Sequence, residues 1–303
     1  MKKNTLTIGT RGSKLALIYA EKVKNELNKI FPNEIKLKKI VTTGDQKQDQ
    51  RLSDIGGKGL FAEKIEKELL NEDIDIAVHA LKDMPTIETE SLLTNNFLKR
   101  NSPNEILISK NNTKFEDLAP NSVIGTSSFR REFQLKKKRS DLKYKLIRGN
   151  VDTRIQKLEN GEFDAILLSK AGIDSLKLEN KITQEFSVDE LIPCAGQGII
   201  AIQCKKNDSD IIDLLEKIND IESRIVANAE REVLKVLEGD CDTAVGVFAK
   251  ITGENVDLVT ELFSVDGKMR YFIRETVKKD KIETVSRMIG EKLKLQSKGS
   301  YKN

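Results

Sequence analysis

The chain has no tryptophan, and aromatic residues of all kinds make up only 5% of its 303 residues. It has one histidine, His79, and three cysteines, Cys194, Cys204 and Cys241, with no CxxC pair among them. This composition offers too few ligands at suitable spacing for a zinc site or a disulfide framework, so we predict no metal site. An excess of one charge is also missing, because 52 basic and 48 acidic side chains leave a net charge of +4. That balance disfavours a dedicated nucleic-acid binder.

Long hydrophobic runs are absent as well. No apolar stretch approaches the roughly 20 residues that a transmembrane helix needs, so we expect no membrane partner. The opening MKKNTLTIG has two lysines but lacks the apolar core of a signal peptide, and we therefore expect a cytoplasmic protein. A hydrophobic content of 38% with 33% charged residues is typical of a globular chain.

The segments that are present alternate between strand-like and helix-like patterns, which predicts an α/β fold with parallel pairing. The first series, from 5 to about 95, has strand-like runs at 6–9, 35–41 and 74–81, and a second series begins near 105. Ile8-Gly-Thr10 and Ile124-Gly-Thr126 each precede a basic turn and a helix, so the two lobes are expected to be built alike.

Three domains are predicted from this order. Residues 1–95 and 191–215 form the first lobe, because the apolar run 198–204 reads as a strand that returns to it. Residues 96–190 form the second lobe. Residues 216–303 form a small α+β domain with a polar tail, 296–303, that we expect to be frayed.

Basic residues gather where strands are expected to give way to helices. The segments Gly125-Thr-Ser-Ser-Phe-Arg-Arg131 and Arg148-Gly-Asn-Val-Asp-Thr-Arg154 carry four arginines, and Arg11 lies at a similar junction. A helix N-terminus repels cations, at a cost of roughly 0.3–1 kcal/mol each, unless an anion is bound there. In an open sheet such junctions collect at the carboxyl ends of the strands. The four arginines together therefore favour an anionic ligand, although a solvated basic face would explain any one of them.

Two other polar features have simpler interpretations. His79 lies in the strand-like run 74–81, where a packed, hydrogen-bonded histidine is more common than a catalytic base. The run Lys136-Lys-Lys-Arg139 is typical of the solvated end of a helix.

Six motifs in order resemble the porphobilinogen deaminase (hydroxymethylbilane synthase) family, from about residue 6 to 295. They are Gly56-Gly-Lys-Gly-Leu-Phe61, His79-Ala-Leu-Lys-Asp-Met-Pro85, Gly125-Thr-Ser-Ser-Phe-Arg-Arg131, Arg148-Gly-Asn-Val-Asp-Thr-Arg154, Ala195-Gly-Gln-Gly198 and Leu237-Glu-Gly-Asp-Cys241. The resemblance implies two lobes with mixed sheets, like those of type II periplasmic binding proteins, and a small C-terminal α+β domain.

The resemblance also implies a transferase of haem and other tetrapyrrole biosynthesis. Such an enzyme joins four porphobilinogen molecules head to tail with release of ammonia, and then frees the linear hydroxymethylbilane by hydrolysis. The implied cofactor is a dipyrromethane attached to Cys241 by a thioether, and the implied enzyme is a monomer with porphobilinogen as its small-molecule partner. The residues implied to bind the cofactor are Cys241, Lys82, Asp83, Thr126, Ser127, Ser128, Arg130, Arg131, Arg148 and Gly149. Those implied to bind substrate are Arg11, Ser13, Lys58, Phe61, Arg148 and Arg154.

Asp83 is the predicted catalytic residue. From the residues alone, a turn cap or a salt bridge to Lys82 is the commoner role for such an aspartate. The resemblance instead implies an aspartate that hydrogen-bonds pyrrole N–H groups and moves protons. Loss of ammonia from porphobilinogen leaves an azafulvene with developing positive charge, and an adjacent carboxylate stabilises that charge more than the neutral ground state.

Cys241 is assigned by the resemblance alone. Its neighbours Asp240 and Asp242 disfavour a thiolate, so charge does not mark it as reactive. Cys204 is expected to be buried in its alternating run, and Cys194 lies in a turn. Only the match of Leu237-Glu-Gly-Asp-Cys241 to the attachment loop of the family distinguishes it.

Four positions depart from the common family pattern, namely Tyr19, Asp54, Ser175 and Ala244. The segment 42–60 is expected to be a mobile lid. A non-enzymatic, two-lobed anion-binding protein would share the lobes and the basic crevice, but it would not need the third domain with its cysteine. An RNA-binding protein is disfavoured by the small net charge and the few aromatics.

Overall fold

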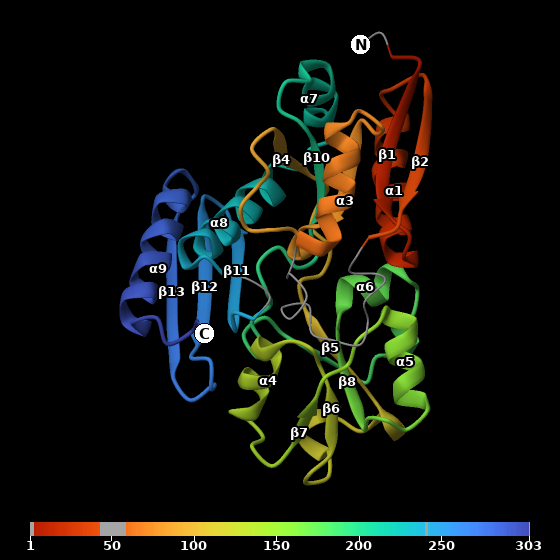
Figure 1. Cartoon of the computed structure of the whole chain (residues 1–303). Coiled ribbons are helices and arrows are strands. Elements are labelled where there is room, and N and C mark those ends of the chain that lie inside the picture. Colours follow the sequence, from red (N-terminus) through yellow and green to blue (C-terminus); the bar gives the residue numbers. More distant parts are fainter. Residues whose placement is uncertain (1–2, 43–58, 240–241, 303) are drawn as a thin grey trace.

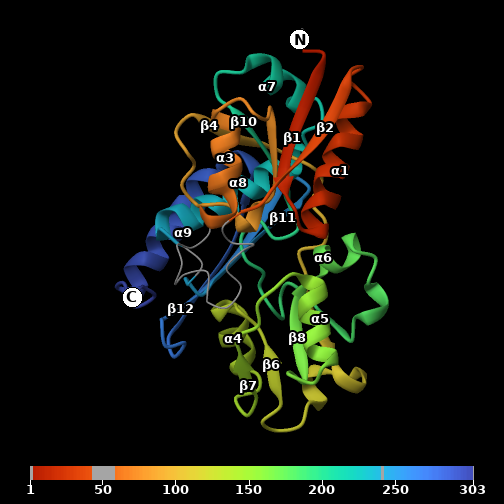
Figure 2. The same ribbon diagram turned by 45° about the vertical axis from the view of Figure 1, so that its right-hand side comes forward.

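The computed structural model describes residues 3–42, 59–239 and 242–302. Two α/β lobes lie one above the other in Figure 1, with a third, smaller domain beside them, and Figure 2 shows the same arrangement from a second side. Lys58, Cys241 and nearly all of the predicted lid lie outside the described residues. No helix in the described part of the chain is long and apolar enough to cross a membrane.

The first lobe is a five-stranded mixed sheet in the order β2-β1-β3-β10-β4. Its strands are β1 (Thr5–Arg11), β2 (Glu34–Ile40), β3 (Ile76–Ala80), β4 (Leu92–Phe97) and β10 (Ile200–Lys205), and its helices are α1 (Lys14–Asn28), α3 (Gly59–Leu70) and α7 (Ser209–Glu216). β1 pairs in parallel with β2 and β3, whereas β10 runs antiparallel to β3 and β4. Because side chains alternate along β3, Ile76 and Val78 pack on the α1 side and Ala77 packs on the α3 side.

The second lobe repeats this plan with the order β7-β6-β8-β5-β9. Its strands are β5 (Glu105–Ser109), β6 (Val123–Gly125), β7 (Lys143–Lys145), β8 (Ala165–Ser169) and β9 (Gln184–Phe186), and its helices are α4 (Phe129–Lys136), α5 (Val151–Glu159) and α6 (Lys170–Ser175). β6 is flanked in parallel by β7 and β8, and β5 is the antiparallel strand. β6 thus occupies the place of β1, as the repeated Ile-Gly-Thr opening predicts.

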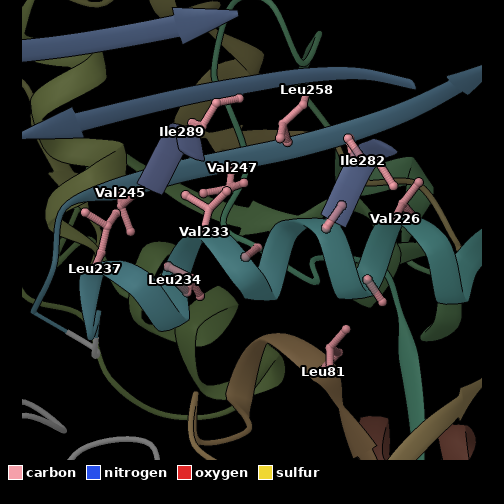
Figure 3. Close-up of a cluster of buried hydrophobic side chains, with 14 of the residues drawn as sticks. Leu81, Val226, Val233, Leu234, Leu237, Val245, Val247, Leu258, Ile282 and Ile289 are labelled. Atoms are coloured by element: carbon pink, nitrogen blue, oxygen red, sulfur yellow. The ribbon is translucent and has the colours of Figure 1, made fainter. Parts of the chain in front are cut away.

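The third domain packs two helices against a three-stranded antiparallel sheet. Its elements are α8 (Ile221–Leu237), β11 (Val245–Thr252), β12 (Asn255–Phe263), β13 (Arg270–Lys278) and α9 (Ile282–Ser297). Figure 3 shows the apolar face of α8, with Val233 and Leu237, against strand residues Val245 and Leu258 and α9 residue Ile289. Leu81 of the first lobe joins the same buried cluster, so the domain is packed onto that lobe.

Several local expectations need correction. The apolar spacing Leu15, Tyr19, Val23, Leu27 and Ile30 predicts a helix face that extends to Ile30, but α1 ends at Asn28 and Ile30 is 40% exposed. The tail is not frayed, since Tyr301 is only 3% exposed. The sequence pattern does not indicate strands β4 and β9 or helices α6 and α7. The strand expected at 198–204 is found as β10 within the first sheet. The domain limits remain a prediction, and strand β4 spans the predicted limit between residues 95 and 96.

Candidate active site between the lobes

A cavity of about 450 Å³ lies between the two lobes. It is built where strands end, because β1, the 3-10 turn Leu81–Asp83 after β3, and β8 all deliver residues to it, together with the start of α5. Its wall comprises Arg11, Gly12, Ser13, Lys14, Leu15, Phe61, Lys82, Asp83, Arg131, Arg148, Gly149, Asn150, Val151, Asp152, Arg154, Leu168, Ser169 and Leu176. The carboxyl-end position is the one predicted for the basic turns.

The structure brings most of the predicted site residues to this cavity. Those in its wall are Arg11, Ser13, Phe61, Lys82, Asp83, Arg131, Arg148, Gly149 and Arg154. Four others do not line it, namely Thr126, Ser127, Ser128 and Arg130. Ser127 donates to the carbonyl of Ile147 (2.8 Å), and Ser128 is the N-cap of α4, so local backbone bonds occupy both hydroxyls.

Arg154 is held in the wall beside other cations. Its Nε donates to the carbonyl of Gly149 at 2.8 Å, and Gly149 itself has φ of +111°, a conformation that a side chain would strain. Burial, and then the charges of Arg131 and Arg148, lower the pKa of Arg154 to about 10, with Asp83 opposing the shift. The repulsion among these guanidinium groups makes the cavity favourable for an anion.

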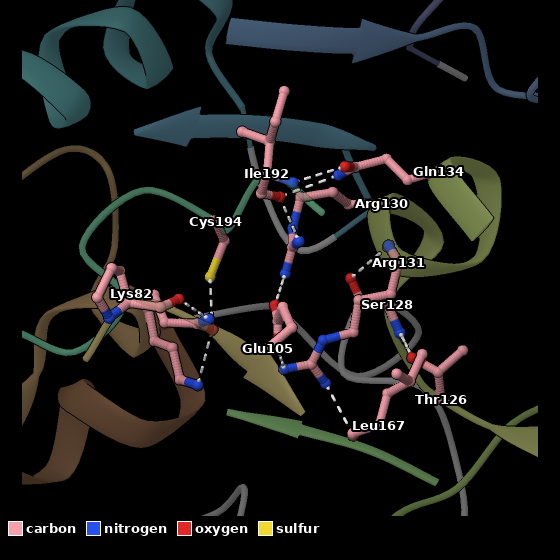
Figure 4. Close-up of polar contacts among 12 residues, drawn as sticks. Lys82, Glu105, Thr126, Ser128, Arg130, Arg131, Gln134, Leu167, Ile192 and Cys194 are labelled. Carbon is pink, nitrogen blue, oxygen red and sulfur yellow. Dashed lines mark hydrogen bonds and ion pairs between the residues drawn. The ribbon is translucent and has the colours of Figure 1, made fainter. Parts of the chain in front are cut away.

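A buried carboxylate underlies the arginines. Glu105, which opens β5, is fully buried and bonds Arg130 and Arg131 through separate oxygens, each at 2.6 Å (Figure 4). The second amino group of each arginine donates to a backbone carbonyl, that of Ile192 for Arg130 and that of Leu167 for Arg131. Burial opposes ionisation of Glu105, but Arg131 and Arg130 outweigh it and lower the pKa of its carboxyl to about 2. No feature of the local sequence marks this glutamate.

Arg131 nevertheless keeps one donor unused among the described residues. Its Nε is buried and has no hydrogen-bond partner there, and Arg131 is part of the cavity wall. A buried N–H without an acceptor costs about 1–3 kcal/mol, so this donor favours an acceptor bound in the cavity.

Asp83 lies opposite, in the turn that follows β3. Its side chain is 39% exposed, and its Oδ2 lies 4.0 Å from a guanidinium nitrogen of Arg11. Arg11 in turn lies over the ring of Phe61, 3.9 Å from its centroid. Lys82 points to Gln197, its Nζ lying 3.4 Å from the side-chain oxygen, so no salt bridge to Asp83 forms (Figure 4).

Two of the positions that depart from the family pattern meet across the lobes. Tyr19 of α1 lies near Ser175 of α6, and Lys22 of α1 donates to Ser175 at 3.3 Å. Burial and the nearby charge of Asp83 raise the pKa of the Tyr19 hydroxyl to about 12, so this phenol stays protonated beside the cavity.

The single histidine and the described cysteines lie outside the cavity wall. His79 is buried in β3, and burial lowers its pKa to about 4, so it is a neutral packed side chain at physiological pH. Cys204 is fully buried, as expected, and burial raises the pKa of its thiol to about 12. Neither group is suited to proton transfer at the cavity.

Comparison with known proteins decides the family. The model for the dipyrromethane cofactor-binding domain of porphobilinogen deaminase matches residues 6–213, and the model for its C-terminal domain matches 225–295. The chain belongs to the porphobilinogen deaminase family. Porphobilinogen deaminase of Chlorobaculum tepidum is 42% identical over 88% of this chain and 86% of that protein. The Bacillus subtilis enzyme of the same name is 40% identical over 90% of this chain and 87% of its own.

Parts of the chain also align with solved structures of other proteins. A probable amino-acid transporter binding protein from Bacillus subtilis aligns with a TM-score of 0.43 and 16% identity, covering 78% of this chain and 97% of that one. The BvgS VFT2 domain of Bordetella pertussis gives 0.43 and 12%, with coverage of 74% and 91%. Membership of an enzyme family leaves the anion-binding alternative without support.

The residues of the cavity fit the dipyrromethane cofactor of this family. That group carries several carboxylates, and the wall presents four arginines, Lys14 and Lys82 against Asp83 and Asp152. Arg131 Nε supplies a buried donor that lacks an acceptor among the described residues. Forked guanidinium groups bind carboxylates in this way.

Proposed function

We propose that this chain joins porphobilinogen units in the cavity between its lobes. The observation that carries the proposal is the convergence of Arg11, Arg131, Arg148 and Arg154 on one cavity that also holds Asp83. Porphobilinogen bears an acetate and a propionate, so a growing pyrrole chain is a polycarboxylate. Arginines bind its carboxylates, while Asp83 is available for the reacting centre, because the other acid of the wall, Asp152, is paired with Lys14 at 2.8 Å.

The arginines act as binding and orienting groups. Arg154 is fixed by the Gly149 carbonyl and Arg131 by Glu105, so little side-chain freedom remains to be lost when a carboxylate binds. Arg11 is backed by the Phe61 ring and faces Asp83, which places a carboxylate clamp beside the acid. We propose that Ser13, Lys82 and Gly149 assist from the wall, and that Lys58 contributes from outside the described residues.

Asp83 is proposed to stabilise charge and move the proton. Its carboxylate is oriented by Arg11 and is partly exposed to the cavity, so it can accept a hydrogen bond from a pyrrole N–H. As ammonia leaves porphobilinogen, positive charge develops on the ring nitrogen, and the fixed carboxylate stabilises it. The same carboxylate can receive the proton that the newly joined ring loses, which is general base catalysis.

Cys241 is proposed to anchor the cofactor, which supplies the covalent primer to which substrate units are added. Attachment to a porphobilinogen unit would form a bond between the Cys241 sulfur and the aminomethyl carbon, while ammonia leaves with the thiol proton. The contribution of Thr126, Ser127, Ser128 and Arg130 is proposed to be the placing of Arg131 and the start of α4, since they lie behind the wall.

We further propose a cytoplasmic monomer that requires neither nucleic acid nor a membrane. The net charge of +4 gives little general attraction to polyanions. Size-exclusion chromatography with light scattering would report one 34.1 kDa chain if this holds, and a dimer mass would contradict it.

The intact mass of the purified protein tests the proposed function, with a Cys241→Ser variant beside it. A covalent excess equal to two condensed pyrrole units, present only with Cys241, is the expected result. If the mass stays bare after incubation with porphobilinogen or with preformed hydroxymethylbilane, the assignment of the cofactor to this chain fails.

A further inference from the structure

The C-terminal residues fold back onto the third domain. After α9, Lys298 and Gly299 both have positive φ (49° and 81°), which reverses the chain. Tyr301 is then buried, with 3% of its surface exposed, although the sequence of this tail is polar. The backbone amide of Val265 donates to the carbonyl of Ser300 at 2.9 Å, so the tail is also fixed by a main-chain bond.

Tyr301 contacts the end of α8. Its hydroxyl donates to the carbonyl of Leu237 at 3.1 Å, and this bond is buried. Leu237 is the last residue of α8 (Figure 3). The carbonyls in the last turn of a helix receive no hydrogen bond from a backbone N–H of the same helix. The tail thus supplies a donor that the helix itself lacks.

Glu238, the residue after Leu237, is also bound by the C-terminal segment. This residue caps α8 in the left-handed conformation, with φ of 51°, which is uncommon for a residue with a side chain. Its carboxylate is paired with Lys302 of the tail and with Lys294 of α9, at 3.1 Å for the latter. Leu237 and Glu238 are therefore both fixed from the C-terminal segment.

A second cavity, of about 370 Å³, is lined both by the C-terminal tail and by the residues on either side of the loop that follows α8. Its wall includes Tyr301 and Lys302, Glu238 on one side of the loop, and Asp242 and Thr243 on the other. Phe129 and Phe133 of α4 complete it, on the same helix that carries Arg130 and Arg131. The tail, the two described ends of the loop and the cofactor-binding lobe therefore meet at one place.

We propose that Tyr301 and Lys302 are positioning residues that fix the end of α8, and through it the chain that leads to Cys241, for covalent loading of the cofactor. This inference rests on the proposed function of Cys241. The two residues touch neither substrate nor the main cavity. Substituting either residue should therefore slow the covalent attachment of the cofactor, while the turnover rate of protein that already carries the cofactor should not change.

The test compares loading rates of the full-length chain produced without cofactor. The wild type, Tyr301→Phe and Lys302→Gln are incubated with preformed hydroxymethylbilane, and the loaded fraction is followed by intact mass. Tyr144→Phe is the matched control, since its hydroxyl is also buried but has no hydrogen-bond partner among the described residues. We expect loading to slow about 2- to 10-fold in Tyr301→Phe and about twofold in Lys302→Gln, with Tyr144→Phe unaffected.

Two further measurements separate positioning from general stability. In Tyr301→Phe, kcat per loaded molecule and KM for porphobilinogen should equal those of the wild type, and the protein should be fully folded by circular dichroism at the assay temperature. Equal loading rates, or slower loading only in proportion to a lost folded fraction, would overturn the inference. A Cys241→Ser variant that still gains mass would instead overturn the proposed attachment site.

Discussion

Glu105 offers the sharpest test of how the site is built. Glu105→Gln keeps the size of the side chain but removes the charge that both Arg130 and Arg131 face at 2.6 Å. The amide also turns one acceptor into a donor that points at a guanidinium group. Breaking a buried ion pair in this way typically costs about 3–5 kcal/mol, since uncompensated cations stay in the interior.

The stability loss translates into a measurable melting temperature. With an entropy of unfolding of about 2.1 cal/mol/K per residue, the 303-residue chain unfolding as one unit would lose about 5–8 °C. The control is Glu179→Gln, an exposed glutamate of the same lobe that should shift the melting temperature by less than about 1 °C. A similarly small shift for Glu105→Gln would refute the argument that this carboxylate holds the two arginines.

The pH dependence of the stability difference between the wild type and Glu105→Gln gives a second check. The pKa of Glu105 is lowered to about 2 in the folded chain, from about 4.5 when unperturbed. A carboxyl whose folded pKa is depressed contributes stability above its unfolded pKa and loses that contribution as pH falls through the folded value. The gap between wild type and Glu105→Gln should therefore be constant above about pH 5 and shrink between about pH 4.5 and 2. A gap that does not change on acidification would contradict the assignment.

Three other predictions follow from the same geometry. Asp83→Asn should lower kcat by about 10²- to 10⁴-fold, the usual contribution of a general acid–base, and a loss below tenfold would refute the catalytic role. Arg154→Met removes a cation from a repulsive group, so the melting temperature should rise while KM for porphobilinogen increases about 10- to 100-fold; unchanged KM would refute carboxylate binding. Gly198→Ala should destabilise the lobe crossing by more than about 1 kcal/mol, because φ is +81° and a Cβ would lie 2.6 Å from the carbonyl oxygen of Asn101. Gly253→Ala, also at positive φ but in open space, is the control, and equal losses in chemical denaturation would point to backbone strain alone.

Much of the fold could be predicted because, in the central elements, the spacing of apolar residues and the positions of helix-capping residues indicate the same helices and strands. β3 (IAVHA) and β8 (AILLS) are largely apolar runs, the apolar residues of β1 alternate with polar ones, and Ser13 and Ser128 cap the helices that follow β1 and β6. The missed strands β4 and β9 are edge strands with one neighbour each, and their sequences, LLTNNF and QEF, show neither a continuous apolar run nor a clear alternation. The missed burial of Tyr301 depends on a partner 64 residues away, which no local pattern can reveal.

The candidate site likewise contains residues that the sequence indicates and residues that only the structure reveals. Arginines in strand-to-helix turns are visible in the sequence because a cation at a helix N-terminus contradicts a local preference. Glu105 is not visible, since a glutamate at the start of a strand contradicts nothing until Arg130 and Arg131 are brought against it by tertiary packing. The contact between Tyr19 and Ser175 is likewise a property of two lobes meeting. Sequence reasoning thus finds the groups that bind the ligand more readily than the groups that hold them in place.

The charge of the cavity also bears on how many pyrrole units it can neutralise. Its wall carries six cationic side chains and two acidic ones, a difference of four, and the buried Arg130 and Glu105 behind it leave that difference unchanged. Each pyrrole unit brings two carboxylates, so the described wall balances the four carboxylates of a two-unit primer. Further units would add negative charge without matching cations in this wall. The described wall therefore balances the carboxylates of two units at a time, so when a new porphobilinogen binds to the wall arginines, the carboxylates of earlier units must find counter-charge in residues beyond this wall or in solvent.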